Sequence, residues 1–208
     1  AEARQNLTAA VEEHSQAMVQ ASRTLAAESG VSFGGIDFSV APYPEQARSV
    51  GTAMEQLGVP AVGLPGSLAA AALITSSLDR AKFARIGFSG LMLPLMEDST
   101  LAARAAQGVL SVTDLMLYSA VCGVGLDTLP LPGDITPQQL YGILLDLATL
   151  SKRLDKPLTA RLMPIPGKRA GDQTDFDFEY FVNSRVLALP SDPVGGLLAG
   201  DETLEFGL

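Results

Sequence analysis

Cysteine, histidine and tryptophan are almost missing from this chain of 208 residues, which has one cysteine, one histidine and no tryptophan. A single cysteine cannot form a disulfide within the chain, so we expect a reducing, cytoplasmic location. With one cysteine and one histidine, a zinc site of the usual composition is excluded within the chain. Charged residues make up only 18% of the sequence and hydrophobic residues 47%, which excludes disorder and predicts extensive burial or a large interface.

Positive charge is also scarce, because 14 lysines and arginines stand against 23 aspartates and glutamates, for a net charge of -9. This acidity argues against a nucleic acid or an anionic membrane as partner. The longest apolar runs, such as Leu68 to Thr75, are too short to span a bilayer. No basic segment followed by an apolar one opens the chain, so we expect no signal peptide. Dinucleotide-binding and Gly-x-Ser-x-Gly motifs are absent as well.

Alternating helix and strand patterns predict one α/β domain over residues 1–208. The helical patterns cover residues 1–28, 45–58, 67–79, 99–108, 112–121 and 136–154. The strand patterns cover residues 31–40, 85–92, 126–129 and 158–163, with one or two more strands within 178–189. Because a helical pattern already begins at Ala1, the chain looks like part of something longer.

The segment 122–134 stands out, since it holds the only cysteine, two aspartates, three glycines and two prolines. Cys122 is a candidate nucleophile or radical site, or an inert buried thiol, and burial is the common fate of free cysteine. No histidine or lysine adjoins it in sequence. The helix expected before it presents a C-terminal end, which disfavours a thiolate. We therefore expect a largely protonated, partly buried thiol.

Carboxylates and cations in the loops offer further candidate sites. Asp127 and Asp134 could bind a divalent cation or orient a substrate, although Asp134 also suits an Asx turn before the helix cap at Thr136. Asp37 ends an expected strand and could face a pocket or form a turn. A glycine-rich loop carries the remaining candidates, in which basic residues could hold an anion and acidic ones a metal, or all could be solvated: Lys168, Arg169, Asp172, Asp175, Asp177 and Glu179.

Five passages together resemble one family, the domain-of-unknown-function 711 family, which is related to proteins labelled pyruvate-formate-lyase-like. They are residues 34–42, 122–128, 130–134, 157–162 and 164–172. The resemblance implies an α/β barrel like that of glycyl radical enzymes, with strands inside and helices outside. It also implies that this chain is the C-terminal half of a longer protein, so that the barrel is incomplete here. Its partner would be the N-terminal half or a second copy.

Glycyl radical chemistry does not follow from this resemblance, because Ala188 stands where the radical site needs glycine. Our hypothesis is an enzyme, or a degenerate enzyme, acting on a small polar or anionic metabolite inside the barrel. Its candidate residues are Cys122 and Asp127 for catalysis, Asp37, Asp134, Arg161 and Lys168 for substrate, and Asp172 and Asp175 for a possible divalent cation. The alternative is a non-catalytic ligand-binding or assembly protein. The enzyme hypothesis requires these side chains to converge within ~10 Å of a common cavity.

Overall fold

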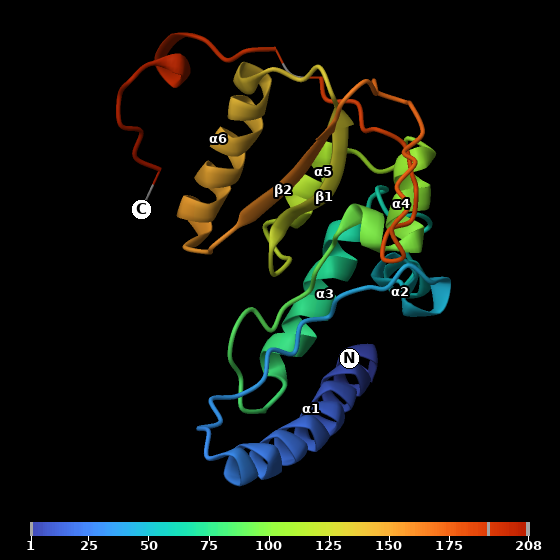
Figure 1. Cartoon of the computed structure of the whole chain (residues 1–208), viewed down its shortest axis with the longest axis vertical. Coiled ribbons are helices and arrows are strands. Elements are labelled where there is room, and N and C mark those ends of the chain that lie inside the picture. The colour runs from blue at the N-terminus through green and yellow to red at the C-terminus, as the bar shows by residue number, and fades with distance from the viewer. Residues whose placement is uncertain (1, 191, 207–208) are drawn as a thin grey trace.

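A computed structural model describes residues 2–190 and 192–206, and Figure 1 shows its arrangement. α1 lies at one end of the molecule and packs against α3, while the two strands and α6 lie at the other end. The elements in chain order are α1 (Glu2–Ser29), η1 (Gln46–Arg48), α2 (Val50–Gln56), α3 (Ser67–Arg80), η2 (Leu95–Glu97), α4 (Ser99–Ala106), α5 (Val112–Tyr118), β1 (Gly125–Pro132), α6 (Pro137–Leu154), β2 (Thr159–Ile165) and η3 (Gly196–Ala199). The predicted α/β class is confirmed, although the expected start at Ala1 lies outside the described residues.

The sheet consists of β1 and β2, which pair in parallel and are joined by α6. Figure 1 shows α6 running beside both strands. The register pairs Gly125 with Thr159 at one end and Pro132 with Ile165 at the other. Between Leu126 and Leu129 the register shifts, because β1 has two residues where β2 has one. The expected strands at 126–129 and 158–163 are therefore present, the first of them twice as long as predicted and the second shifted by one or two residues.

The hydrophobic core surrounds β1 and takes most of its residues from helices α2 to α5, with Ile143 and Leu147 from α6. The β1 leucines Leu126, Leu129 and Leu131 are fully buried, whereas β2 alternates between exposed and half-buried positions. α1 contributes only Val11 and Ser15 as buried residues. No helix in residues 2–190 and 192–206 is both long and apolar enough to cross a membrane.

Two more extended segments continue the parallel arrangement beyond β1. Ile36 forms a parallel bridge with Arg85, and Val40 forms another with Leu91. The amide of Gly123 then donates to the carbonyl of Leu91 (2.6 Å), which brings this pair alongside the start of β1. The segments thus lie in chain order, 36–40, 85–92, β1 and β2, as they do when each parallel strand is joined to its spatial neighbour.

The prediction of full strands over 31–40 and 85–92 is wrong, since only these isolated bridges form. Side chains take the amides that a ladder would use. The carboxylate of Asp37 accepts the amides of Phe88 (2.9 Å) and Ser89 (2.8 Å), and the Ser89 hydroxyl accepts the amide of Phe38 (3.2 Å). Side-chain bonds of this kind compete with a backbone ladder.

The prediction of strands within 178–189 is also wrong, because the described residues there form only a single bridge between Arg185 and Gln173. The Asn183 side chain accepts the amide of Phe176 (2.8 Å) and donates to its carbonyl (3.0 Å). The Thr174 hydroxyl accepts the amide of Ser184 (2.8 Å). These polar side chains hold the segment as an irregular hairpin.

Two predicted helix starts need correction as well. The helix expected from 45 begins at Val50, because Ser49 is extended and its hydroxyl caps Thr52 (2.8 Å). Ser67 is the first residue of α3 and not its cap, which is Gly66. Its hydroxyl instead accepts the amide of Gly63 (3.1 Å) and donates to the carbonyl of Leu64 (2.7 Å).

The described residues show no barrel. The strands of residues 2–190 and 192–206 form one two-stranded parallel sheet, which is not closed. The outer edge of β2 has no strand partner in the described part of the chain. The coarser prediction of a mixed α/β fold is confirmed.

Candidate functional site

The face of the sheet that points away from α6 carries a cluster of charged side chains. Leu158 and Ala160 lie against α6, where they share a surface groove with Leu144 and Leu147. Because successive residues of a strand point to opposite faces, Arg161 lies on the other face. There its guanidinium meets Asp127 of β1.

Arg161 is held by two carboxylates from different elements. Its Nε donates to Oδ1 of Asp127 (2.5 Å), and its Nη2 donates to Oε1 of Glu97 from η2 (2.7 Å). The side chain of Asp127 is 4% exposed, that of Glu97 26% and that of Arg161 52%. We call these three residues the charged cluster. A buried carboxylate thus positions a half-exposed guanidinium on the open face of the sheet.

A β-bulge in β1 places Asp127 opposite Arg161. Asp127 and Thr128 together oppose that one residue of β2, and Thr128 adopts a left-handed conformation with φ 49°. A β-branched residue rarely adopts this conformation, so the backbone is strained there. The Thr128 hydroxyl compensates by accepting the amide of Met96 (3.1 Å) next to Glu97. Bulges and strain of this kind concentrate beside functional sites.

The electrostatics of the charged cluster bear on the kind of ligand it suits. The hydrogen bond that Arg161 donates to Asp127 holds the pKa of the guanidinium above its ordinary value, against the effect of burial, and the charges of Asp127 and Glu97 act in the same direction. Two carboxylates also leave the cluster with a negative charge that a single guanidinium does not balance. A neutral or cationic polar group is therefore a better match than the anion expected at Arg161.

Cys122 lies apart from the charged cluster, at the wall of a groove of about 520 Å³. It is 1% exposed, and its sulfur accepts the amide of Gly125 (3.3 Å). Its own amide bonds the carbonyl of Tyr118 at the C-terminal end of α5 (2.9 Å), as expected from the sequence. The thiol is more deeply buried than the partial burial we predicted.

Asp37 anchors the turn that forms one rim of this groove. Burial opposes its ionisation, but the Ser39 hydroxyl and the amides of Ser89 and Phe88 together hold the pKa of Asp37 below its ordinary value. Its three hydrogen bonds are all made within the protein. In this structure Asp37 supports the turn, as the turn alternative predicts.

The loops after β1 and β2 hold the remaining predicted residues. The loops meet where the amide of Gly133 donates to the carbonyl of Lys168 (2.9 Å). Lys168 is paired with Asp175 (3.1 Å), and the carboxylate of Asp172 accepts the amide of Arg169 (2.7 Å). Asp134 is exposed nearby. Within residues 2–190 and 192–206, no three side chains of histidine, cysteine, aspartate or glutamate come together as a metal site would require.

The predicted residues therefore divide into three places. Asp127 and Arg161 meet on the open sheet face, Cys122 and Asp37 flank the groove, and the loop residues lie past the other end of β1. A strand of eight residues spans about 26 Å, so the ends of β1 are too far apart for one cavity. The structure does not bring the predicted residues to a common site.

Sequence reasoning missed Glu97, Thr128 and Lys156. In the sequence, Glu97 looks like any other surface carboxylate. Its partner in β2 lies 64 residues away, so no neighbouring residue indicates the contact. Thr128 needs knowledge of the strand register before its backbone can be judged unusual. Lys156 follows a left-handed residue at the end of α6, Asp155 (φ 48°), and no sequence motif distinguishes this lysine from other surface lysines.

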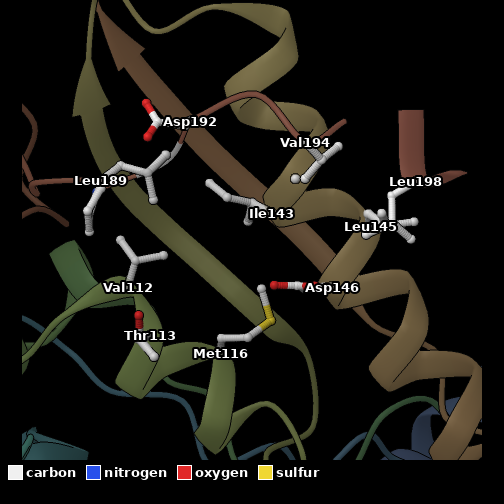
Figure 2. Close-up of a pocket in the computed structure, with 12 residues that line it drawn as sticks. Val112, Thr113, Met116, Ile143, Leu145, Asp146, Leu189, Asp192, Val194 and Leu198 are labelled. Atoms are coloured by element: carbon white, nitrogen blue, oxygen red, sulfur yellow. The ribbon is translucent and has the colours of Figure 1, made fainter. Parts of the chain in front are cut away.

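A second cavity, of about 320 Å³, lies between α5, α6 and the C-terminal segment. Figure 2 shows Met116 of α5 and Asp146 of α6 pointing toward each other across it. Leu189 and Val194 contribute from the C-terminal segment. None of the residues predicted from the sequence lines this cavity.

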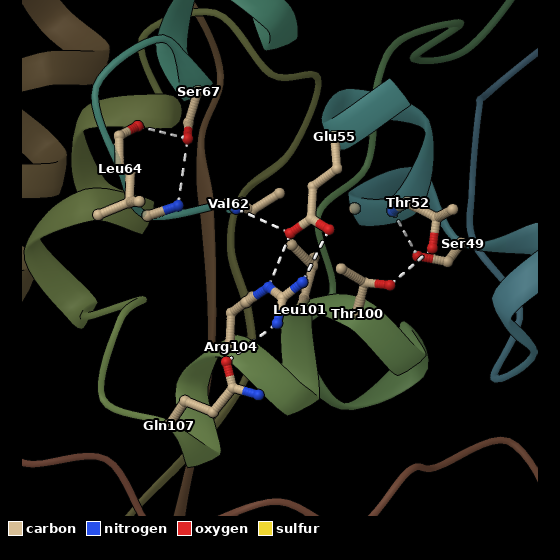
Figure 3. A network of polar contacts seen from close by, with 12 residues as sticks. Ser49, Thr52, Glu55, Val62, Leu64, Ser67, Thr100, Leu101, Arg104 and Gln107 are labelled. Carbon is tan, nitrogen blue, oxygen red and sulfur yellow. Dashed lines mark hydrogen bonds and ion pairs between the residues drawn. The ribbon is translucent and has the colours of Figure 1, made fainter. Parts of the chain in front are cut away.

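A further charged contact joins α2 to α4 and is structural. Figure 3 shows Arg104 bound through two nitrogens to Glu55, at 2.7 and 2.8 Å, while Glu55 also accepts the amide of Val62 (3.0 Å). Both side chains are fully engaged with protein groups, with 25% and 20% of their surfaces exposed. This contact fastens two helices and leaves little room for a ligand.

Comparison with known proteins identifies similar sequences. A family model described as "Uncharacterised ACR (DUF711)" matches residues 2–183. A UPF0210 protein of Pyrobaculum arsenaticum is 41% identical over 157 residues, 74% of this chain and 35% of that protein. UPF0210 proteins of Syntrophobacter fumaroxidans and Methanopyrus kandleri are 39% and 37% identical over 158 and 155 residues, 74% and 73% of this chain, and 35% and 34% of those proteins. The chain thus spans about a third of the length of these relatives.

Proposed function

This chain belongs to the DUF711 family, and from that premise we propose that it is part of an enzyme, or of a degenerate enzyme, that binds a small polar metabolite at the charged cluster. The observation that carries the proposal is the pairing of a buried Asp127, in a strained bulge, with a half-exposed Arg161. Strain and a desolvated carboxylate cost stability, and proteins retain such features where they serve a site. Asp127 and Glu97 accept hydrogen bonds from the ligand, and Arg161 donates one.

The ligand in this proposal is neutral or cationic, such as a polyol or an amine. The negative charge of the cluster opposes a free carboxylate or phosphate, unless a group from outside this chain offsets it. Glycyl radical chemistry is not part of the proposal, because Ala188 replaces the required glycine. Cys122 is not assigned a role at the charged cluster, since it lies by the groove.

We place the charged cluster inside an α/β barrel that this chain forms in part. Three observations support this: the extended segments are parallel, they lie in chain order, and the outer edge of β2 is unpaired in the described residues. An exposed edge of this kind is normally covered. The remaining strands come from the N-terminal half of the protein or from a second copy.

An assembly role without catalysis is the second candidate. It is favoured by large apolar side chains that α1 and α6 leave exposed: Met18, Leu25, Tyr141, Leu144 and Leu154. Isolated exposed apolar residues are common, but here they accompany an unpaired strand edge. In the assembly alternative these surfaces bind the partner, and the charged cluster only orders the sheet.

Melting temperatures of the full-length protein with panels of small compounds separate the two candidates. We expect polyols or amines to raise the melting temperature of the wild type, and carboxylates and phosphates to have no effect. The shift should disappear in Arg161→Lys, which keeps the charge but lacks the planar guanidinium whose Nε and Nη2 reach Asp127 and Glu97. Lys168→Arg is the matched control at an exposed ion pair and should keep the shift. An equal shift in Arg161→Lys, or none with any compound, would leave assembly as the better account.

A further inference from the structure

The groove beside Cys122 contains an amine that the proposed function does not use. Its walls come from α3, from the turn at 87–90 and from the segments that lead into β1 and β2. Lys156 and Pro157 form the last of these walls. The amide of Lys156 bonds the carbonyl of Ser151 (3.0 Å), and its carbonyl accepts the Ser151 hydroxyl (2.6 Å). The backbone of Lys156 is therefore fixed at the end of α6.

The amino group of Lys156 has no carboxylate partner. Its Nζ donates to the carbonyl of Ser119 (3.0 Å), and it forms no ion pair with any residue in the described ranges. Lys168, in contrast, is paired with Asp175. An amine that is half-buried in a groove and lacks a counter-ion differs from an ordinary surface lysine, which extends into water.

The surroundings favour the neutral amine. Burial lowers the pKa of Lys156 below its ordinary value, and the groups that act in the opposite direction are Cys122 and Asp79. Asp79 is exposed and lies near Arg85 (3.5 Å), so its charge is shared and screened. A desolvated lysine of this kind is a nucleophile toward carbonyl carbon.

We propose that Lys156 binds a small aldehyde or keto compound covalently, as an imine, in the groove beside Cys122. The lone pair of the neutral Nζ forms a bond to the carbonyl carbon, and the π electrons of the carbonyl move to its oxygen, which takes up a proton. The resulting carbinolamine then loses water. Overall, an ammonium group and a carbonyl compound give a protonated imine and one water molecule, without any oxidant or reductant.

The dimensions of the groove fit such a ligand. A volume of about 520 Å³ holds a compound of metabolite size. Its floor is tight, since a Cβ on Gly123 would come within 3.1 Å of the Cα of Gly90. Cys122 also lines the groove, and its buried thiol is small and only weakly polar. The inference is independent of the charged cluster, because the two sites share no residue.

A structural role for Lys156 makes a different prediction. Its amino group bonds a carbonyl at the C-terminal end of α5, where a cation stabilises a helix. An arginine could serve that purpose equally well, whereas only a primary amine forms an imine. Lys156→Arg therefore separates the two roles. Lys152, exposed on the last turn of α6, is the matched control lysine.

The experiment is reductive trapping of the full-length protein with glyoxylate or pyridoxal and cyanoborohydride at pH 7, followed by peptide mass mapping. We expect Lys156 to be modified clearly faster than Lys152, although it is less exposed, because burial lowers the pKa of the Lys156 amine. Lys156→Arg should lose this modification and keep its melting temperature, and Lys152→Arg should keep the modification. Arg161→Lys should also keep it, which distinguishes this inference from the proposed function. Equal or slower modification of Lys156, or modification only after unfolding, would overturn the proposal.

Discussion

Thr128 combines a left-handed backbone conformation (φ 49°) with a hydroxyl that accepts the buried amide of Met96. Glu97 follows Met96 in the chain, and its carboxylate binds Arg161. A single threonine thus links the bulge in β1 to the position of η2. Because Thr128 is fully buried, its hydroxyl has no water to replace this bond.

Substitution of Thr128 tests whether the hydroxyl is what the site needs. Thr128→Ala leaves the Met96 amide unpaired, which should cost about 1–3 kcal/mol of unfolding free energy. Thr128→Ser keeps the hydroxyl and removes a methyl group, so its loss should be clearly smaller, since only a packing term remains. Urea unfolding of both variants measures the difference. If serine costs as much as alanine, the methyl group and not the hydroxyl holds the bulge.

At the scale of elements, the start of β1 depends on one glycine. Gly125 has φ 114°, and a Cβ there would collide with the carbonyl of Thr159 on β2. Gly125→Ala should therefore lower the unfolding free energy by more than 1 kcal/mol, since strain in the backbone adds to the clash. Gly171→Ala is the control, because Gly171 also has a positive φ (90°) but open space around it. Equal losses in urea unfolding would show that conformation alone, and not the approach of the strands, matters.

The contact between α2 and α4 predicts a pH dependence. The hydrogen bond from Arg104 holds the pKa of Glu55 below its ordinary value of 4.5, against the effect of burial, and the amide of Val62 adds to it. A lowered carboxyl pKa contributes stability that is fully present above 4.5 and is lost as the pH falls through the folded-state pKa. Urea midpoints measured from pH 7 to pH 3 should thus fall less steeply for Glu55→Gln than for the wild type. Parallel curves would mean that this pair does not contribute to acid sensitivity.

Helices were easier to predict than strands, for local reasons. Thr136 caps α6 and forms a capping box with Gln139, and Pro137 takes the first helical position, so the start of α6 follows from neighbouring residues. The extended segments depend on partners far along the chain. Asp37 takes amides 51 and 52 residues away, and no local pattern announces that this carboxylate interrupts a strand.

For the molecule as a whole, the sequence indicated the residue types of the site more successfully than their arrangement. Asp127 and Arg161 were predicted and do meet, because they occupy facing positions of two parallel strands. Cys122, Asp134 and Lys168 appeared to belong with them, but β1 separates its two ends. Residues that are close in sequence within the segment 122–134 suggested one site. The length of β1, which separates them, could not be judged from the sequence.

One explanation covers both the edge of β2, which has no strand partner among the residues that the structure describes, and the open face beside it. If further parallel strands extend the sheet, the face with Arg161 becomes an interior and the face with α6 an exterior. The chain spans about a third of the length of its relatives, and those relatives have sequence outside the matched part. The exposure of Arg161, at 52%, would then fall on assembly.

A crystal structure of the full-length protein tests the central claim most directly. We predict a further parallel strand on the free edge of β2, and an enclosed cavity on the face opposite α6, lined by Asp127, Arg161 and Glu97. A helix packed over Arg161, or a sheet that leaves the charged cluster on the outer surface, would contradict the account and remove the charged cluster as the ligand site.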